Sequence, residues 1–282
     1  MRVQRRRASL LSFVLFAGAC SKVERSELAT PIASSGPAAR ELLARPGFAW
    51  QTVTTPIARI HTEQGSKVER MVPALADSIA DARRVALRTL REPELDNEAK
   101  LELFLVDTRD DMQRLMGRPI GGFAQPGELT AAFVAGPGYR PFLRHELTHA
   151  YAAVRWGTLA AGVWLTEGLA ALAQGACQGH EVDALAAGYL AQGAIPPLRA
   201  LAERFREFPE VPSYLAAASA ISFMERETNI DAIRGLWRGT ADGVREHPLG
   251  KDGESREARW RTYLGTVSPA VLDTARLRRE GC

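Results

Sequence analysis

Regular patterning begins near Phe48, where two short segments alternate between apolar and polar residues. These segments, "FAWQTV" and "PIARIHT", are typical of strands. Beyond them, apolar residues recur at steps of three or four, which predicts one long helix with a single buried stripe. The stripe comprises Val68, Met71, Val72, Leu75, Ile79, Ala82, Ala86 and Leu90. We expect this stripe to pack in the core.

The middle of the chain predicts two further strands and a short helix between them. The run "LELFLV", residues 101–106, has the composition of a buried strand. Asp107 or Thr108 can cap the helix that follows, and Gly117 can end it. A turn-rich loop, "PIGGFAQPGE", then leads to the second strand, "LTAAFVAG", at residues 129–136.

From Pro141 onward the pattern predicts mainly helices. Pro141 suits the first turn of a helix, and Gly157 can close that helix. The expected helices are Pro141–Trp156, Thr166–Ala173, Tyr214–Glu227, Ile230–Trp237 and Glu254–Leu264. No internal repeat and no domain boundary is visible after residue 46. The simplest architecture is therefore one α+β domain over residues 46–282.

The N-terminus has the features of an export signal. A basic cluster at residues 5–7 precedes the apolar run "SLLSFVLFAGA", which ends at Cys20 and is too short for a permanent membrane anchor. The ending "AGAC" resembles the lipobox of bacterial lipoproteins, although Ala17 stands where leucine is more usual. That resemblance implies a signal peptide over residues 1–20 and lipidation of Cys20. Residues 21–45, rich in Ala, Ser, Pro and Glu, are then a flexible tether.

Lipidation would anchor the protein in the bacterial cell envelope, on the periplasmic side or at the outer membrane. The alternative is a secreted protein that is cut near the same position. The start "RRRASLL" also resembles a twin-arginine signal, so both export routes stay open.

Charge and cysteine content narrow the function classes further. The 282 residues include 36 basic and 33 acidic ones, and the first twenty contribute four arginines and no acid. The remaining 32 basic residues nearly balance the 33 acidic residues, so charge gives no case for nucleic-acid binding. If Cys20 carries lipid, Cys177 and Cys282 remain as a pair in an oxidising compartment. We expect either a disulfide that ties the C-terminus to the core or two free thiols.

The segment "HELTH" in the helix after Pro141 carries the candidate chemistry. His145 and His149 are four residues apart and lie on one helix face, so they can direct two imidazole nitrogens at one metal ion. Glu146 is poorly placed as a ligand but can reach a water on that metal. In the alternative, these side chains serve packing or surface ion pairs, and the histidines need other hydrogen-bond partners.

Glu167 is the candidate third ligand. It lies eighteen positions after His149, and the intervening turn lets a second helix fold back across the first. Three protein ligands and one open position are what a catalytic zinc requires. Two alternatives remain: Glu167 as an exposed carboxylate at a helix start, and a structural zinc closed by a fourth ligand, for which Cys177 is the only nearby cysteine.

The segments "HELTH" and "WLTEGLA" together resemble the gluzincin metallopeptidases, and the layout from Trp50 to Leu264 is similar to a bacterial peptidase-MA-like family. The resemblance implies a zincin-like α+β fold: a small mixed sheet with an edge strand over the active-site helix, then a mainly helical part. It also implies that His145, His149 and Glu167 bind zinc and that Glu146 acts on the water. The edge strand would be "LTAAFVA", along which a peptide substrate aligns by β-augmentation.

Two departures from the family pattern limit the resemblance. Thermolysin-like enzymes place an aspartate four residues after the third ligand, where this chain has Ala171. The "GAMEN"-like motif with which aminopeptidases bind a substrate amine is absent, which favours an endopeptidase over an exopeptidase. Tyr214 resembles the family's candidate for stabilising the oxyanion, although Ala216 replaces the usual glutamine. Its alternative role is that of an amphipathic residue at a helix edge.

The sequence thus predicts a zinc-dependent peptidase that acts on peptide or protein substrates at the cell envelope. The second hypothesis is a catalytically inactive zincin-fold lipoprotein that serves as a binding module. The intact Glu146 argues for the enzyme, because loss of the general base would be the simplest sign of an inactive relative.

Overall fold

The computed structural model describes residues 24–25, 35–95, 98–245, 247–275 and 277. Most of the predicted signal peptide and tether lies outside these residues, as do Cys20 and Cys282. Among the described residues, no helix is both long enough and apolar enough to cross a membrane.

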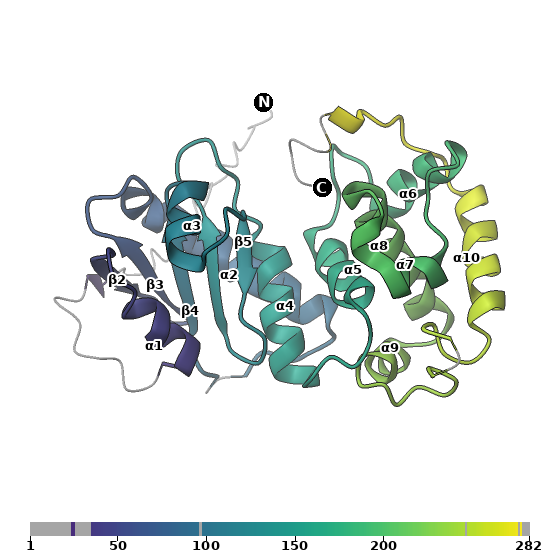
Figure 1. Cartoon of the computed structure of the whole chain (residues 1–282), viewed down its shortest axis with the longest axis horizontal. Coiled ribbons are helices and arrows are strands. Elements are labelled where there is room, and N and C mark those ends of the chain that lie inside the picture. Colours follow the sequence, from purple (N-terminus) through teal and green to yellow (C-terminus); the bar gives the residue numbers. More distant parts are fainter. Residues whose placement is uncertain (1–23, 26–34, 96–97, 246, 276, 278–282) are drawn as a thin grey trace, which may run out of the picture.

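A six-stranded sheet occupies one half of the molecule, with strand order β1-β2-β3-β4-β6-β5 (Figure 1). Its strands are β1 Glu24–Arg25, β2 Trp50–Thr54, β3 Ala58–Glu63, β4 Leu101–Val106, β5 Gly122–Ala124 and β6 Thr130–Val134. The strands β2 and β3 form an antiparallel pair, whereas β3, β4 and β6 run parallel. At the far edge, β5 is antiparallel to β6. The predicted α+β class and mixed sheet are therefore confirmed.

The predicted edge strand is wrong. The segment "LTAAFVA" contains β6, which is paired on both sides, with β4 and with β5. The edge is β5, which lies inside the segment predicted to be a turn-rich loop. The strand β5 has only three residues and begins at the second of two neighbouring glycines, so it shows no strand pattern in the sequence. Its strand conformation comes from pairing with β6.

Helices cover both faces of the sheet, which explains why every residue of β4 is buried. On one face, α1 (Pro37–Leu43) and α3 (Arg109–Met116) pack against alternate strand residues. That cluster contains Ala39, Leu42, Phe104, Val106, Met112, Leu115, Ala132 and Val134. The other face, with Leu103 and Phe133, packs against α2 (Val72–Thr89) and α4 (Leu143–Trp156) in the larger core.

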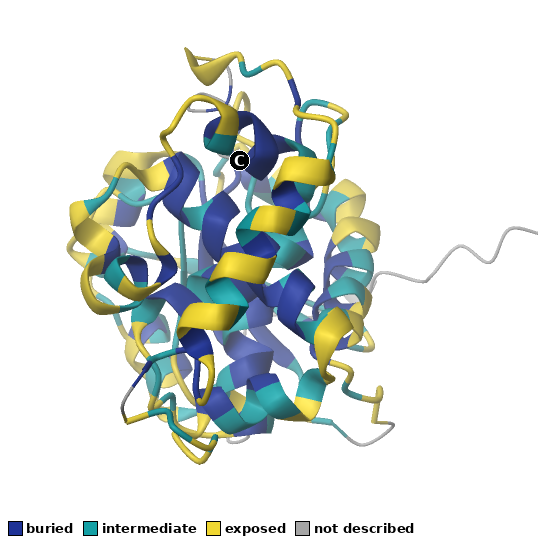
Figure 2. Cartoon of the chain, turned by 90° about the vertical axis from the view of Figure 1, so that its right-hand side faces the viewer, coloured by how far each residue is buried: buried dark blue, intermediate teal, exposed yellow. Residues whose placement is uncertain are grey.

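Helices make up the other half of the molecule, and α4 lies between them and the sheet (Figure 1). They are α5 Val163–Gln174, α6 Val182–Ala191, α7 Leu198–Arg204, α8 Glu210–Glu227, α9 Ile230–Trp237 and α10 Gly253–Thr266. Two 3₁₀ helices, η1 Val68–Met71 and η2 Phe205–Glu207, precede α2 and follow α7. Figure 2 shows that α10 exposes one face to solvent and turns the other inward.

The contact between α5 and α8 is unusually close because of Gly168. A Cβ atom there would lie 2.5 Å from Cδ1 of Ile221 and 2.9 Å from the backbone of Ala217, distances that no side chain tolerates. Glycine therefore lets the two helices approach, and this approach brings α8 next to the residues on α5 that are described below.

Most predicted elements are present. The corrections concern the end of the tether and two additional helices. Thr108 caps α3 through a capping box and Gly117 ends it with φ 74°, as predicted. The tether boundary is wrong at its C-terminal end, because α1 falls within residues 21–45 and buries Ala39 and Leu42 against the sheet. The helices α6 and α7 are additional to the predicted set.

Candidate metal centre

The helix α4 presents the "HELTH" segment with one side held in the core. Leu147, Ala150 and Tyr151 are almost fully buried, whereas His145 and His149 are half-buried and point away from that packing. Gly157 follows the helix with φ 85° and turns the chain back toward it. The apolar stripe of α4 thus fixes the orientation of both imidazoles.

The helix α5 supplies Glu167 to the same place. Trp164 and Leu165 are fully buried and Leu169 is nearly so, which anchors α5 against the core. Glu167, on the opposite side, meets both histidines: its Oε2 lies 3.3 Å from Nε2 of His145 and 3.4 Å from Nε2 of His149.

These three side chains form a group of donor atoms that can hold a metal ion. The two Nε2 atoms are 3.0 Å apart, so the three separations span 3.0–3.4 Å. An ion bound tetrahedrally with bonds of about 2.0–2.1 Å separates its ligand atoms by about 3.3–3.4 Å. The donor set therefore fits one triangular face of such a tetrahedron.

Electrostatics keep the Glu167 carboxylate ionised. Burial acts to raise its pKa, but hydrogen bonds and charge interactions with His145 and His149 outweigh burial and lower the pKa far below the usual 4.5. For His149, burial acts to lower the pKa, and contact with Glu167 reverses this, so the pKa is raised. His149 and the Glu167 carboxylate thus favour the charged form of each other in the space where a cation would bind.

Thr166 contacts the ring nitrogen of His149 that faces away from the triad. Its hydroxyl lies 2.8 Å from Nδ1 of His149, on the side of the ring opposite to the triad. A partner at Nδ1 directs Nε2 toward the metal position, which is the role that an aspartate plays in thermolysin-like enzymes. Ala171 stands at the expected aspartate position and only lines the cleft. The sequence carries no signal for Thr166, because the contact depends on how α4 and α5 cross.

Glu146 is the buried carboxylate beside the triad, with only 8 % of its surface exposed. Burial is the main cause that raises the pKa of its carboxyl group, and the negative charge of Glu167 adds to it. The edge strand β5 passes so close that a Cβ atom on Gly122 would lie 2.7 Å from Oε1 of Glu146. Gly122 is thus a site residue that the sequence analysis missed, and its only sequence signal is the pair of glycines in the loop.

Tyr214, on α8, lies next to His145 and Glu167 of the triad. Its ring stacks near that of His145 at 5.9 Å between centroids. Burial, the charge of Glu167 and a hydrogen bond with that carboxylate all raise the pKa of the Tyr214 hydroxyl far above 10. The hydroxyl is therefore a neutral donor directed at the metal centre.

A cleft of about 840 Å³ runs beside these residues and has walls from both halves of the molecule. One wall carries Gly122 of β5 together with Arg109 and Arg140, and the other carries residues of α5, α6 and α8. His145, Glu146 and Tyr214 all line it. The candidate metal centre is thus accessible to a ligand much larger than water.

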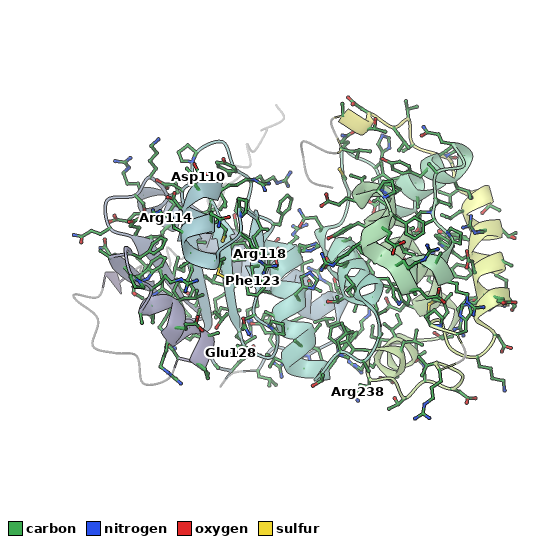
Figure 3. All side chains as sticks on the ribbon, in the orientation of Figure 1. Asp110, Arg114, Arg118, Phe123, Glu128 and Arg238 are labelled. Atoms are coloured by element: carbon green, nitrogen blue, oxygen red, sulfur yellow. The ribbon has the colours of Figure 1, made fainter. Side chains whose placement is uncertain are left out.

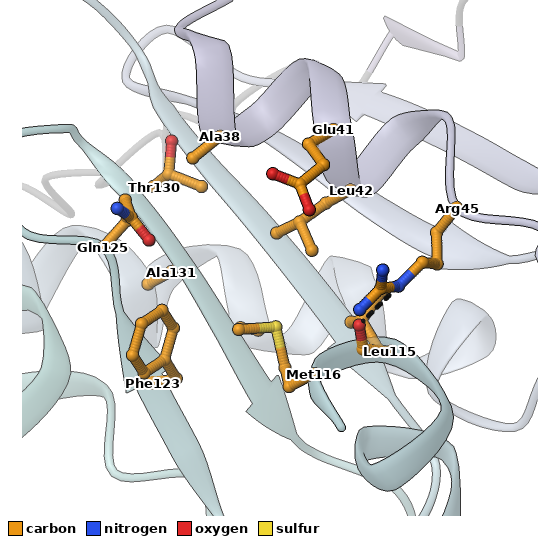
Figure 4. Close-up of a pocket in the computed structure, with 11 residues that line it drawn as sticks. Ala38, Glu41, Leu42, Arg45, Leu115, Met116, Phe123, Gln125, Thr130 and Ala131 are labelled. Atoms are coloured by element: carbon orange, nitrogen blue, oxygen red, sulfur yellow. Dashed lines mark hydrogen bonds between the residues drawn. The ribbon is translucent and has the colours of Figure 1, made fainter. Parts of the chain in front are cut away.

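A second, smaller cavity of about 180 Å³ lies on the other side of β5, between α1, α3 and β6 (Figure 4). Phe123 lines it, and the guanidinium of Arg118 lies 5.5 Å from the Phe123 ring on this outer side (Figure 3). None of the candidate metal ligands His145, His149 and Glu167 lines this cavity. The two faces of the edge strand therefore border different sites, and only the inner face carries candidate chemistry.

Cys177 lies just beyond α5 and lines the larger cleft. It is buried and disulfide-bonded, and it is not part of the metal-binding group. This argues against a structural zinc completed by Cys177. The predicted pairing with Cys282 stays a prediction, because Cys282 is outside the described residues.

The arrangement as a whole can bind a divalent cation with three side chains from two helices and place a buried carboxylate next to it. A neutral hydroxyl group faces the same point from a third helix. No known family model matches the chain, and no curated protein matches it.

Proposed function

We propose that this protein is a zinc-dependent peptidase of the gluzincin type, for which an endopeptidase is the expected form. One observation carries the proposal: the donor atoms of His145, His149 and Glu167 lie 3.0–3.4 Å apart, with the Glu146 carboxylate buried beside them. Two imidazoles and one carboxylate are a donor set of known catalytic zinc sites, which leave one position open.

His145, His149 and Glu167 would hold the zinc ion, which would supply Lewis acidity and make a water molecule more acidic. Glu146 accepts the proton from the attacking water and returns it to the leaving amine. Its raised pKa suits the first task, because a carboxylate with a higher pKa is a stronger base. Tyr214 donates its hydroxyl hydrogen to the negative oxygen that develops on the scissile carbonyl.

The substrate is a peptide in extended conformation that adds to β5. Within the described part of the chain, β5 pairs with β6 only, so its other edge can accept main-chain hydrogen bonds. The contact between Gly122 and Glu146 supports this, because it places a peptide on that edge next to the general base.

Sequence features support a location at the bacterial cell envelope, with an anchor through lipidated Cys20 and peptide or protein substrates from the same compartment. The second candidate function is a zincin-fold binding module without activity. The buried position of Glu146 beside the triad favours the enzyme, since a binding module has no need of a carboxylate buried there.

The test is to measure metal content and hydrolysis together. We expect about one zinc per molecule, and we expect Glu146→Gln to keep the metal while hydrolysis of a mixed peptide library falls roughly a hundred- to ten-thousandfold. A chelator should abolish wild-type activity, and added zinc should restore it. Zinc bound without hydrolysis by the wild type would support the binding module, and protein refolded with zinc that binds none would end the proposal.

A further inference from the structure

Two half-buried glutamines in the cleft, away from the candidate metal-binding triad, each have one buried amide atom without a hydrogen-bond partner. Within the described part of the chain, Oε1 of Gln174 and Nε2 of Gln178 are fully buried and form no hydrogen bond. Both residues line the large cleft. A buried polar atom without a partner costs on the order of 1–3 kcal/mol, so such atoms in a cleft wall point to a ligand that satisfies them.

The turn that carries Gln178 is rigid and unusual for its sequence. Cys177 and His180 exchange two backbone hydrogen bonds of 2.9 Å, and Cys177 is held by a disulfide. Between them, Gln178 has φ 53° and Gly179 has φ 79°, as in a type I′ turn. Asn, Asp or Gly normally occupies the first of these positions, and glutamine there is strained. A long amide side chain kept at a strained, well-anchored position indicates a role in recognition.

The position of Gln174 relates this wall to the metal centre. Gln174 is the last residue of α5 and follows Glu167 by seven positions, which returns it to the same helix face two turns later. Ala171, between them, also lines the cleft. Seven residues correspond to about 10 Å along the helix, and an extended peptide covers that length in about three residues.

We propose that Gln174 and Gln178 form a specificity subsite that binds the carboxamide side chain of an asparagine or glutamine in the substrate, two to three residues from the scissile bond. This inference rests on the proposed peptidase function. The wall offers one acceptor, Oε1 of Gln174, and one donor, Nε2 of Gln178. A carboxamide provides the matching donor and acceptor in one planar group, whereas a carboxylate has no donor and an ammonium has no acceptor.

The experiment uses three otherwise identical peptides with Gln, Glu or Met at the tested position, which is moved from one to four residues on either side of the cleaved bond. The full chain is tested for kcat/KM, and its Glu146→Gln variant is tested for the Kd of each peptide. We expect the Gln peptide to be preferred about tenfold over the Met peptide at the second or third position, as two neutral hydrogen bonds allow. The Glu peptide should be no better than the Met peptide.

Two substitutions then separate recognition from structure. Gln174→Met keeps the side-chain length, and Gln178→Gly removes the amide while suiting the positive φ. Each should abolish the preference for the Gln peptide over the Met peptide without lowering Tm. Gln113→Ala, at an exposed glutamine on α3 outside the cleft, is the matched control and should keep the preference.

The outcomes also separate the subsite from the proposed function. Equal cleavage of the Gln and Met peptides, or a preference for the Glu peptide, would overturn the subsite and leave the peptidase standing. A binding preference for the Gln peptide with no hydrolysis by the wild type would support the subsite and overturn the peptidase. A Tm loss in both variants with the preference intact would assign the two glutamines a structural role only.

Discussion

Two clusters in this molecule bring a histidine against a glutamate, and they differ in what surrounds the pair. At the candidate metal centre, Glu167 meets His145 and His149 at 3.3 and 3.4 Å. On the sheet, Glu102 meets His61 at 2.7 Å. The first cluster borders a cleft, whereas His61 is fully buried and stacks on Phe104.

The sheet cluster is closed because both carboxylate oxygens of Glu102 and both ring nitrogens of His61 have partners from the chain. Arg59 and Ser35 both donate to Oε1 of Glu102, and His61 contacts Oε2. The other ring nitrogen of His61 lies 2.9 Å from the hydroxyl of Thr52. The positive charge that Glu102 requires is thus supplied by a side chain, and no room or need for a metal ion is left.

The metal centre lacks such a side chain. Among the described residues, no lysine or arginine forms an ion pair with Glu167, and its partners are two imidazoles and a tyrosine hydroxyl. A carboxylate buried without a permanent cation is costly unless a cation arrives from outside. The comparison teaches that a histidine–glutamate contact indicates a metal site only when no arginine closes it.

The largest expected effect is a loss of bound zinc, which should occur when the candidate metal centre is altered and not when the sheet cluster is altered. Glu167→Gln should reduce bound zinc to near zero and lower hydrolysis by at least the roughly hundred- to ten-thousandfold that loss of the general base alone would cause. Glu102→Gln, the matched control, should keep zinc at about one per folded molecule. Metal analysis of the purified, folded proteins measures both. If the two variants retained equal amounts of zinc, the distinction between an open and a closed cluster would fail.

The next largest effect concerns stability at the closed cluster. Arg59→Met leaves Glu102 buried with its permanent cation removed, so the free energy of unfolding should fall by about 3 kcal/mol. Zinc content should not change. Arg114→Met, at an exposed arginine that pairs with Asp111, should cost less than about 1 kcal/mol. Urea unfolding checks both values, and similar losses in the two variants would contradict the role of Arg59.

A smaller effect tests how the ligand His149 is held. Thr166→Val preserves the shape of the side chain and removes the hydroxyl that contacts Nδ1 of His149, so zinc affinity should fall roughly ten- to a hundredfold. Thr52→Val removes the corresponding hydroxyl next to His61 and should leave zinc affinity unchanged. Competition with a chromophoric zinc chelator measures the affinities. An unchanged affinity in Thr166→Val would show that another group orients the ring.

The sequence predicted the parts of this molecule that depend on local spacing. The four-residue interval between His145 and His149, the cap at Thr108 (one of the two predicted candidates, with Asp107) and the helix end at Gly117 are all set by neighbours along the chain. The positions of four strands along the chain were also predicted. Alternation of apolar and polar residues indicated β2 and β3, and strand-like runs indicated β4 and β6.

The missed features all depend on tertiary contacts. The helix α1 has seven residues and no long amphipathic pattern, and its burial comes from α3 and the sheet. The helix α6 is apolar on nearly every side, so no period marks it. Gly122 and Thr166 join the site only because β5 folds onto β6 and α5 crosses α4. Sequence spacing alone carries no information on such contacts.

The smallest expected effect is the pH dependence that the closed cluster adds to stability. Burial acts to raise the pKa of Glu102, but hydrogen bonds from His61, Arg59 and Ser35 outweigh it and lower the pKa below 4.5. A carboxyl group whose pKa is lowered in the folded state binds its proton more readily when unfolded. Its contribution is therefore complete well above pH 4.5 and is lost as the pH falls through the folded pKa.

Glu102→Gln cannot titrate and should remove this dependence. The difference in the free energy of unfolding between wild type and Glu102→Gln should be constant near pH 7 and shrink below about pH 4.5. It should shrink by up to about 1.4 kcal/mol for each unit by which folding lowers the pKa. Urea unfolding at several pH values between about 3 and 7 gives both curves. A difference that stays constant to pH 3, or grows on acidification, would mean that Glu102 is not held ionised by Arg59 and His61, and the closed cluster would then need another explanation.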